Sequence, residues 1–321
     1  MDLMNFNHVA KLLCESKKCL VGVSGGIDSM VMLHWINSHR SKISADITVM
    51  YVNHDIHPNS HEWGQLVKTT CEEYNLPFVN VKVNLSGLGN NLEYAARKAR
   101  YKAFCEFGAD TLILAHHAND QFECFLLKLF RGSGLKGLKA MSQSTKCWYD
   151  EKTTLIRPML DVTKYKIHAY AEYYNLKYVD DPSNGDSKYD RNYIRNHLMP
   201  VISQRFEIAD VNAVRSIQHV SEAWELTQQL ADIDLQSCTT TDGHLDWEKM
   251  KNLGYLRIKN VILRILDMEN AYGFSIGHIE QFSLGIMNAS MDSKTELGLK
   301  NMSIQKIGKK IKIIKRVELA A

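Results

Sequence analysis

The sequence predicts an α/β fold in which a parallel sheet has helices on both faces and is followed by a smaller, mainly helical C-terminal domain ending in a basic, strand-like tail. Strand-like apolar segments alternate with helix-like segments through residues 1–200, and this alternation is typical of parallel sheets. The 321 residues with 45% hydrophobic composition are enough for two domains. The alternation ends after residues 198–206, so we expect one domain over 1–205 and another over 206–321.

The elements of the first domain are expected in regular order. Short apolar runs predict strands, and runs with apolar residues three or four positions apart predict helices. The strands are expected over 19–23, 47–52, 78–83, 111–115 and 154–160, and the helices over 28–38, 60–74, 91–107, 120–130 and 163–174. Asn90, three residues before Glu93, gives the third helix a capping-box-like start. In the second domain, residues 211–235 predict a long helix.

The overall composition is that of a soluble protein with free thiols. The N-terminal residues 1–20 lack a basic stretch followed by a long apolar run, and no later window has the length of a membrane span, so we expect a cytoplasmic protein. The seven cysteines are an odd number and form no Cys-x-x-Cys pair. This pattern argues against a disulfide framework, a zinc ribbon and an iron–sulfur site.

The end of the chain is basic, although the net charge of the whole chain is only +3. Residues 300–321 contain seven lysine and arginine residues, Lys309 and Lys310 among them, and a single glutamate. Because residues 306–316 roughly alternate, the lysines are compatible with a solvated edge strand. They are equally compatible with contacts to a nucleic-acid backbone, and the sequence leaves both interpretations open.

A glycine-containing loop follows the first predicted strand and opens a helix, in the sequence "SGGIDS" at residues 24–29. Gly25 and Gly26 allow a sharp turn with exposed backbone N–H groups, and Ser24 and Ser29 add hydroxyl donors at the positive end of the helix dipole. The loop lacks the lysine of a P-loop, so it suits a leaving pyrophosphate with Asp28 near magnesium. The alternative is a turn whose polar residues only cap the helix.

Polar residues also follow the fourth predicted strand, in the sequence "AHHANDQFE" at residues 115–123. Ligands of open parallel sheets bind at the carboxyl ends of the strands, so His116 and His117 are expected beside the glycine-containing loop. Adjacent residues at a strand end point apart, which favours acid/base or nucleotide contacts over a shared metal. Asp120 and Glu123 are three apart on the following helix and share a face, as a site or as a solvated pair.

Together these segments resemble the tRNA(Ile)-lysidine synthetase family of the N-type ATP pyrophosphatase (PP-loop) superfamily. The resemblance covers roughly residues 18–200 and rests on "SGGIDS", "VNHDIH", "NLEYAARKARY", "AHHANDQFE", "RGSGLKGL", "IRPML" and "DDPSNGDSKYDRNYIRN", in family order. It implies a Rossmann-like PP-loop domain that uses ATP and Mg²⁺ to adenylate the C2 oxygen of the wobble cytidine in tRNA(Ile). L-lysine then displaces AMP. The resemblance implies no association with a membrane. It leaves open whether the protein forms a homodimer.

The resemblance also implies roles for individual residues. The ATP-binding residues would be Ser24, Gly25, Gly26, Ile27, Asp28, Ser29, Val52, Arg131 and Gly132, with Asp28 also near Mg²⁺. Catalysis would involve Asp28, His117 and Arg97, and lysine would be bound by Asp120, Glu123 and Arg97. Arg100, Arg191, Arg195, Lys309 and Lys310 would contact tRNA. The forked guanidinium groups suit phosphates and carboxylates, although Arg97 and Arg100 would also fit a solvated helix face.

Three positions in two segments depart from the family pattern. Asp55 and His57 stand where the family usually has glycine and arginine, which removes a basic side chain, and Asn119 stands where it usually has aspartate, which removes a negative charge. The rival interpretations are another PP-loop enzyme, such as a tRNA thiolase, an NAD synthetase or a GMP synthetase, and an inactive tRNA-binding relative. Thiolation usually needs paired cysteines, and an inactive protein would tolerate a damaged "SGGIDS" loop, which is intact here.

Overall fold

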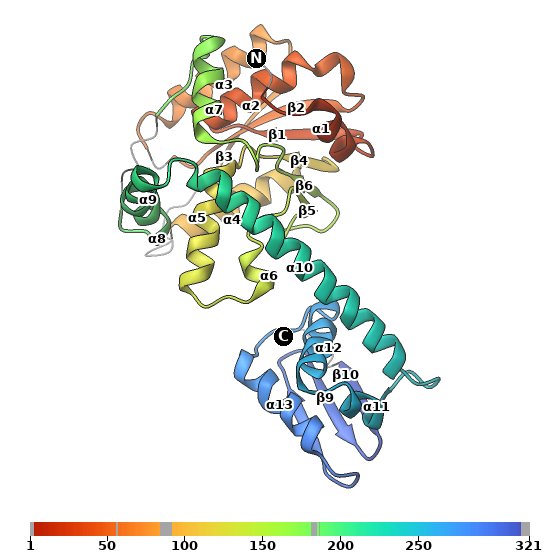
Figure 1. Ribbon diagram of the computed structural model, residues 1–321. Helices are drawn as coiled ribbons and strands as arrows, with labels where there is room; N and C mark the ends of the chain where they lie inside the picture. The colour runs from red at the N-terminus through yellow and green to blue at the C-terminus, as the bar shows by residue number, and fades with distance from the viewer. Residues whose placement is uncertain (1–2, 56, 84–91, 181–184, 186, 316–321) are drawn as a thin grey trace. The chain divides into compact units, whose positions relative to one another are not determined.

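The computed structural model describes residues 3–55, 57–83, 92–180, 185 and 187–315 (Figure 1). The expected capping box at Asn90 and the tail residue Arg316 lie outside the described residues. Two compact units divide the chain into Met1–Val220 and Ser221–Ala321. This division falls inside the continuous helix α10 (Ala209–Cys238), whereas the loss of alternation in the sequence placed a boundary near Arg205.

The first unit is built on a six-stranded sheet with the strand order β3-β2-β1-β4-β6-β5. The strands are β1 (Lys18–Gly22), β2 (Asp46–Asn53), β3 (Phe78–Lys82), β4 (Thr111–Ile113), β5 (Ser144–Lys146) and β6 (Thr154–Ile156). Neighbouring strands pair in parallel except for β5, which runs antiparallel to β6 at the edge. The parallel sheet confirms the predicted fold class. The sequence did not predict β5 because its three residues are exposed and show no apolar pattern.

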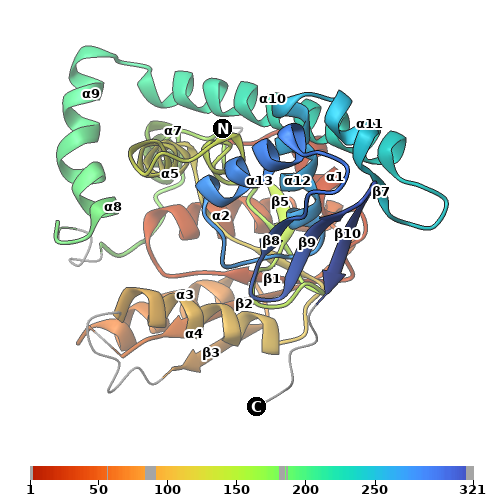
Figure 2. The ribbon, with the colours of Figure 1, turned by 90° about the horizontal axis from the view of Figure 1, so that it is seen from below.

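Helices cover both faces of this sheet (Figures 1 and 2). The α-helices before α10 are α1 (Phe6–Leu13), α2 (Ile27–Ser38), α3 (Ser60–Glu73), α4 (Leu92–Glu106), α5 (Ala118–Phe130), α6 (Leu135–Leu138), α7 (Lys164–Tyr173), α8 (Asp190–Tyr193) and α9 (Met199–Arg205). Side chains along a strand alternate between the two faces. In β1, Val21 belongs to the core formed with α2, α3 and α7, whereas Leu20 belongs to the core that contains Tyr101 and Phe104 of α4.

The strand order places the ends of β1 and β4 next to each other, at the point where the chain connections on the two sides of β1 run in opposite directions along the sheet. The chain leaves β1 toward β2 on one side, while β4 pairs with β1 on the other. Such a switch point is where open α/β sheets bind ligands. Gly22 at the end of β1 is required for close packing, because a Cβ atom there would lie 2.7 Å from Leu114 and 2.8 Å from Phe104.

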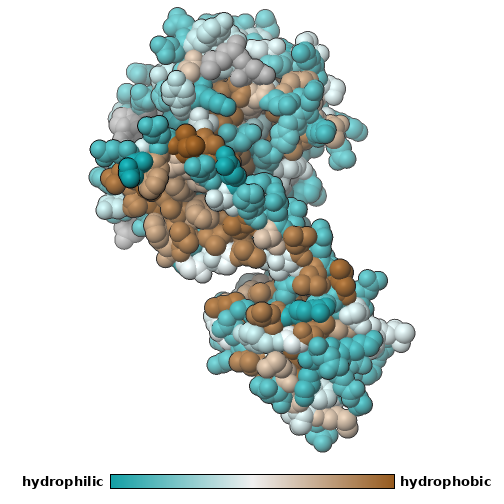
Figure 3. All heavy atoms as spheres, viewed as in Figure 1, coloured by the Kyte–Doolittle hydropathy of each residue, from teal (hydrophilic) through white to brown (hydrophobic). Residues whose placement is uncertain are grey.

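Helix α5 begins at this switch point and is buried at its start. Asp120 and Glu123 in its first turns are 7% and 2% exposed. Its other end is exposed, and apolar side chains gather on the surface over α5 and α6 (Figure 3), where Leu129, Phe130 and Leu135 lie exposed. The polar residues at the start of α5 are therefore enclosed by the fold, and the apolar residues at its end face solvent.

The second unit packs helices against a four-stranded antiparallel sheet of order β7-β10-β9-β8. It contains the C-terminal part of α10 with α11 (Trp247–Asn252), α12 (Tyr255–Met268), α13 (Ile276–Asn288), β7 (Leu245–Asp246), β8 (Thr295–Gly298), β9 (Met302–Ile307) and β10 (Lys310–Lys315). The predicted helices and strand-like end are confirmed. The sequence did not predict the sheet beyond that end, because β7 and β8 are too short to show a pattern.

Most lysines of the basic tail have partners inside this unit. Lys309 pairs with Glu248 at 2.9 Å, Lys315 pairs with Glu269 at 2.6 Å, and Lys310 pairs with Asp242. Lys306 is fully buried, and its ammonium group donates to the carbonyl oxygens of Ser290, Met291 and Ser293. Strand β10 also lies between β7 and β9 where it begins, so its first residues are not at an edge of the sheet.

Replacing Lys306 by methionine is expected to lower the free energy of unfolding by about 2 to 4 kcal/mol. The change would remove a fully buried ammonium group that donates to three carbonyl oxygens and lies 4.4 Å from the centre of the Trp247 ring. The measurement is urea denaturation of the full chain, with the partly exposed Lys312→Met as the control, for which we expect less than about 0.5 kcal/mol. Equal stability of the two variants would contradict the structural role of Lys306.

Candidate functional site

A cavity of about 370 Å³ lies at the switch point of the first unit. The residues lining it come from the ends of β1, β2 and β4 and from helices α2, α3 and α4. Those assigned to ATP from the sequence are Ser24, Asp28, Ser29 and Val52, and Arg100 lines the cavity with them. The volume and the mixed polar and apolar walls suit a nucleotide-sized ligand.

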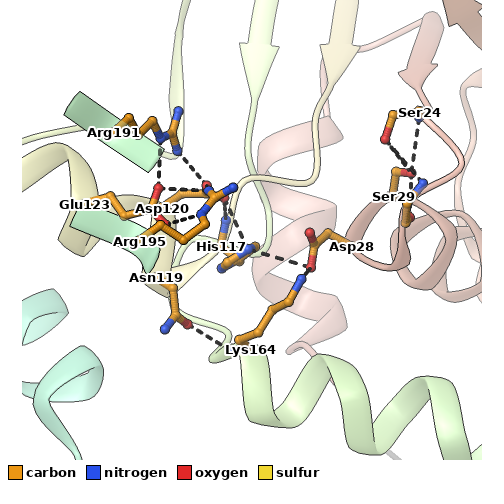
Figure 4. A network of polar contacts seen from close by, with 11 residues as sticks. Ser24, Asp28, Ser29, His117, Asn119, Asp120, Glu123, Lys164, Arg191 and Arg195 are labelled. Carbon is orange, nitrogen blue, oxygen red and sulfur yellow. Dashed lines mark hydrogen bonds and ion pairs between the residues drawn. The ribbon is translucent and has the colours of Figure 1, made fainter. Parts of the chain in front are cut away.

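The loop after β1 has the backbone geometry of an anion site. Gly25 has a φ of +87°, in the left-handed region that favours glycine. The Ser29 hydroxyl donates to the Gly26 carbonyl at 2.9 Å and accepts the Ser24 N–H at 3.1 Å, which fixes the turn (Figure 4). Gly26 precedes α2 without a side-chain cap, so the first N–H groups of the helix are available to a ligand.

Asp28 connects this loop to two other segments. Its Oδ1 atom accepts a hydrogen bond from the Lys164 ammonium at 2.6 Å and lies 3.6 Å from His117 Nε2 (Figure 4). His117 Nε2 also lies 3.4 Å from Asp120 Oδ2. His117 is therefore placed between two carboxylates, one at the start of α2 and one at the start of α5.

Asp120 and Glu123 form a compact ion-pair network with Arg191 and Arg195 (Figure 4). Glu123 accepts from Arg191 Nε at 2.8 Å and from Arg195 Nε at 2.6 Å, while Asp120 accepts from Arg191 Nη2 at 2.6 Å. The arginines come from α8 and from the π-helical turn Ile194–Leu198, a type of irregularity that is frequent at functional sites. The sequence assigned these arginines to tRNA and the carboxylates to lysine, and it did not predict their pairing.

The charges of the network favour ionised groups. Burial alone would raise the pKa of Asp120, but His117, Arg191 and His116 together with the His117 backbone N–H lower it to about 2. The pKa of Arg191 is raised, because Asp120 and Glu123 outweigh the opposing effect of burial. Burial lowers the pKa of His116 to about 3, so this histidine is neutral at pH 7. Asp120 therefore carries its charge under all ordinary conditions.

This low pKa predicts an acid-sensitive contribution to stability. Because the pKa of Asp120 is about 2 in the folded chain and lies below the usual 3.8 of an aspartate side chain, its contribution is present above about pH 4 and is lost as the pH falls toward 2. Between about pH 5 and pH 2, wild type should lose about 2 kcal/mol more of its unfolding free energy than Asp120→Asn. Denaturation at several pH values measures this difference. Parallel pH profiles for the two proteins would contradict it.

The other residues assigned from the sequence lie in different surroundings. The Arg97 guanidinium group lies 5.1 Å from the centre of the Tyr101 ring, on α4. Arg131 pairs with Asp190 at 2.9 Å in an exposed position, and neither Arg131 nor Gly132 lines the cavity described above. Within the described ranges, no three His, Cys, Asp or Glu side chains converge in a way that could hold a metal ion.

The residues that depart from the family pattern each have defined contacts in the structure. Asp55 has a φ of +54°, which accounts for the usual glycine there, and it pairs with Lys82 at 2.6 Å. His57 lines the cavity and stacks on Trp63 with 4.9 Å between ring centroids. The Asn119 side-chain oxygen accepts the Lys164 backbone N–H at 3.0 Å (Figure 4), a contact that needs an oxygen but no charge.

Sequence reasoning missed three polar residues of this region. Lys164 binds Asp28, and His54 lines the cavity with its Nδ1 atom buried. Arg157 is 7% exposed and donates to the Ser142 carbonyl at 2.9 Å. Arg157 belongs to the quoted segment "IRPML" and could have been identified there. Lys164 could not, because a lysine in the first turn of a helix is not distinguished by any sequence pattern.

The chain is similar to one protein family and to several named bacterial proteins. The PP-loop domain family matches residues 3–202. A tRNA(Ile)-lysidine synthase of Haemophilus ducreyi is 32% identical, with 92% of this chain and 68% of the relative covered. The tRNA(Ile)-lysidine synthase of Hydrogenovibrio crunogenus is 37% identical, covering 75% and 58%, and that of Photorhabdus laumondii is 37% identical, covering 76% and 56%. The matched regions thus span between 56% and 68% of these curated relatives.

A solved structure shows the same fold. The U34-tRNA thiolase NcsA from Methanococcus maripaludis, solved with its [4Fe-4S] cluster, aligns with a TM-score of 0.54 and 20% identity over 67% of this chain and 78% of that chain. At this identity the likeness concerns the fold alone. Among the described residues, no helix has the length and apolar character needed to cross a membrane.

Proposed function

Because the chain belongs to the tRNA(Ile)-lysidine synthase family of PP-loop proteins, we propose that it converts the wobble cytidine of tRNA(Ile) to lysidine. ATP adenylates the C2 oxygen of the cytidine with release of pyrophosphate, and L-lysine then displaces AMP. The observation that carries this proposal is the placement of the "SGGIDS" loop, His117 and the two carboxylates of α5 around one switch point.

ATP is proposed to bind in the cavity with its phosphates on the loop after β1. Backbone N–H groups at the start of α2 and the Ser24 and Ser29 hydroxyls suit the phosphate oxygens. Mg²⁺ usually takes one or two carboxylates together with phosphate oxygens, so the Asp28 carboxylate on the cavity wall fits this ion. When bound, Mg²⁺ would supply charge stabilisation at the phosphates.

L-lysine is proposed to bind near Asp120 and Glu123, with its carboxylate toward Arg97. Arg191 and Arg195 hold both carboxylates in fixed positions, and fixed carboxylates are what a pocket for a cationic amino acid needs. The position of His117 beside Asp28 and Asp120 suits it to accept a proton from the attacking amine. The nucleophile and the adenylated base would then meet at the start of α5.

tRNA is proposed to contact Arg100, the α8 region and the tail lysines Lys309 and Lys310. The tail lysines form exposed ion pairs, which are weak enough for nucleic-acid phosphates to replace. Arg191 and Arg195 are also proposed to contact tRNA. Because both arginines already pair with Asp120 and Glu123, the tRNA would contact them at the edge of this ion-pair network. Arg100 lines the cavity, which suits a contact with the reacting nucleotide.

Lys309→Gln/Lys310→Gln is expected to lower tRNA affinity about tenfold and to reduce the slope of log affinity against log salt by about 2, with unchanged ATP affinity. Substitution is preferable to deletion, because β10 contributes the fully buried Ile311. Filter binding at several salt concentrations measures the effect. The control is Lys68→Gln/Lys102→Gln, which breaks two exposed helical ion pairs. Equal effects of the two double variants would contradict a specific role for the tail.

The test of the proposed function is pyrophosphate release with purified tRNA(Ile), tRNA(Met) and no tRNA, each with and without lysine. We expect release that depends on tRNA(Ile), and lysidine in the recovered tRNA only when lysine is present. Activity that requires a sulfur donor, or that uses ammonia without tRNA, would replace the proposal with another PP-loop reaction. tRNA binding without pyrophosphate release would indicate an inactive relative.

A further inference from the structure

The first residue of α7, Lys164, is held at the candidate site by four separate features. Its ammonium group donates to Asp28 Oδ1 at 2.6 Å, and its backbone N–H donates to Asn119 Oδ1 at 3.0 Å (Figure 4). One residue earlier, Thr163 caps α7, and its hydroxyl accepts the Lys166 N–H. The backbone of Val162 also accepts the Ala118 N–H at 2.9 Å. The start of α7 is thus fixed against the start of α5.

The position of the Lys164 ammonium has an electrostatic consequence for nucleotide binding. The side chains of Lys164 and Asp28 are 36% and 31% exposed, so the pair is only partly screened by water. Asp28 lies on the wall of the cavity proposed for ATP. A carboxylate without a counterion at this point would repel the phosphates of ATP, whereas a carboxylate paired with an ammonium group repels them less.

We propose that Lys164 is a positioning residue that neutralises and orients Asp28 until Mg²⁺ takes over the same carboxylate. This inference rests on the proposed ATP site and names a function for a residue outside the family motifs quoted above. Lys164 acts through Asp28, and the ammonium group and the metal ion are alternative counterions of one carboxylate. The loop after β1 can therefore receive ATP before the metal is in place.

The proposal predicts a difference between metal-free and metal-bound ATP. Lys164→Met should bind ATP in the presence of EDTA about tenfold more weakly than wild type, because the Asp28 charge is then uncompensated. With excess Mg²⁺ its affinity for ATP should be within about twofold of wild type, since the metal supplies the missing charge. Lys164→Arg should restore binding in EDTA. Isothermal titration calorimetry with ATP alone and with Mg-ATP measures all of these affinities.

Two further variants separate this role from others. Lys166→Met makes the same substitution at an exposed position of the same helix and should behave as wild type under both conditions. Asp28→Asn/Lys164→Met should bind metal-free ATP as Asp28→Asn does, because no carboxylate remains to be neutralised. Thermal denaturation of every variant establishes that the chain is folded, and the ratio of the two ATP affinities is independent of the fraction of active protein.

Three outcomes would overturn the inference. In the first, Lys164→Met weakens the binding of metal-free ATP and of Mg-ATP equally, and does so both alone and combined with Asp28→Asn. This result would show that Lys164 contacts the phosphates directly. Unchanged affinities would show that the ion pair has no role in binding. If the wild-type chain binds no ATP in either form, the proposed function fails together with this inference, whereas in the first two cases the proposed function stands.

Discussion

Replacing Asp28 by asparagine is expected to reduce tRNA-dependent pyrophosphate release at least about a hundredfold while the chain stays folded. The variant removes the negative charge of Asp28 from the cavity wall. It thereby removes the proposed contact to Mg²⁺ and the ion-pair partner of Lys164. A loss of a hundredfold corresponds to about 2.7 kcal/mol of transition-state stabilisation, which is the lower end of the range found when one preorganised electrostatic contact to a transition state is removed.

The fold should survive this change because Asp28 is not part of the packing of α2. That helix is anchored by a continuous set of buried side chains, including Ile27, Met30 and Leu33, whereas the Asp28 side chain is 31% exposed. The control is Asp161→Asn at an exposed position, for which we expect unchanged release. Wild-type turnover by a folded Asp28→Asn variant would rule out the proposed role of this carboxylate.

Glu123→Gln is expected to raise the lysine concentration needed for half-maximal lysidine formation ten- to hundredfold. This range corresponds to about 1.5 to 3 kcal/mol for a charge-assisted contact. The adenylation step should be largely retained, because the Glu123 side chain lies beside Asp120 and the arginines and does not line the nucleotide cavity. The two steps are separated by measuring lysidine formation against lysine concentration and pyrophosphate release without lysine.

The same variant should also be less stable by about 3 kcal/mol. Glu123 is 2% exposed and accepts hydrogen bonds from both arginines, so a neutral amide would leave two partly buried cations with one counterion fewer. Glu106→Gln, in an exposed pair with Lys102, is the matched control and should change neither stability nor lysine use. If Glu123→Gln impaired both steps in parallel, the residue would be structural and the lysine pocket would lie elsewhere.

The sequence was informative where chemistry is carried by neighbouring residues. The "SGGIDS" loop, His117 and the carboxylates of α5 occur in short segments at predicted strand ends, and the parallel sheet brings those ends together. The sheet could be predicted because its strands are apolar and alternate with helices. The edge strand β5 is polar and only three residues long, so its sequence carried no comparable signal.

Partnerships between distant segments could not be predicted in this way. Arg191 was singled out in the sequence, but its partner Asp120 depends on how α8 packs against α5. Likewise, Lys306 resembles the other lysines of the tail in sequence, and only its position on β9 over Trp247 distinguishes it as a buried residue. Composition gives the charges of a segment, whereas packing decides which charges remain available to a ligand.

The ion-pair network has a consequence for how the site assembles during folding. Its hydrogen bonds join residues 68 to 75 positions apart, with α6, β5, β6 and α7 in between. The entropy lost in closing so long a segment favours formation after the intervening elements have packed. Interactions that form after the transition state mainly retard unfolding. The network should therefore act chiefly on the lifetime of the native state, and the speed at which the chain folds should be set by the sheet beneath it.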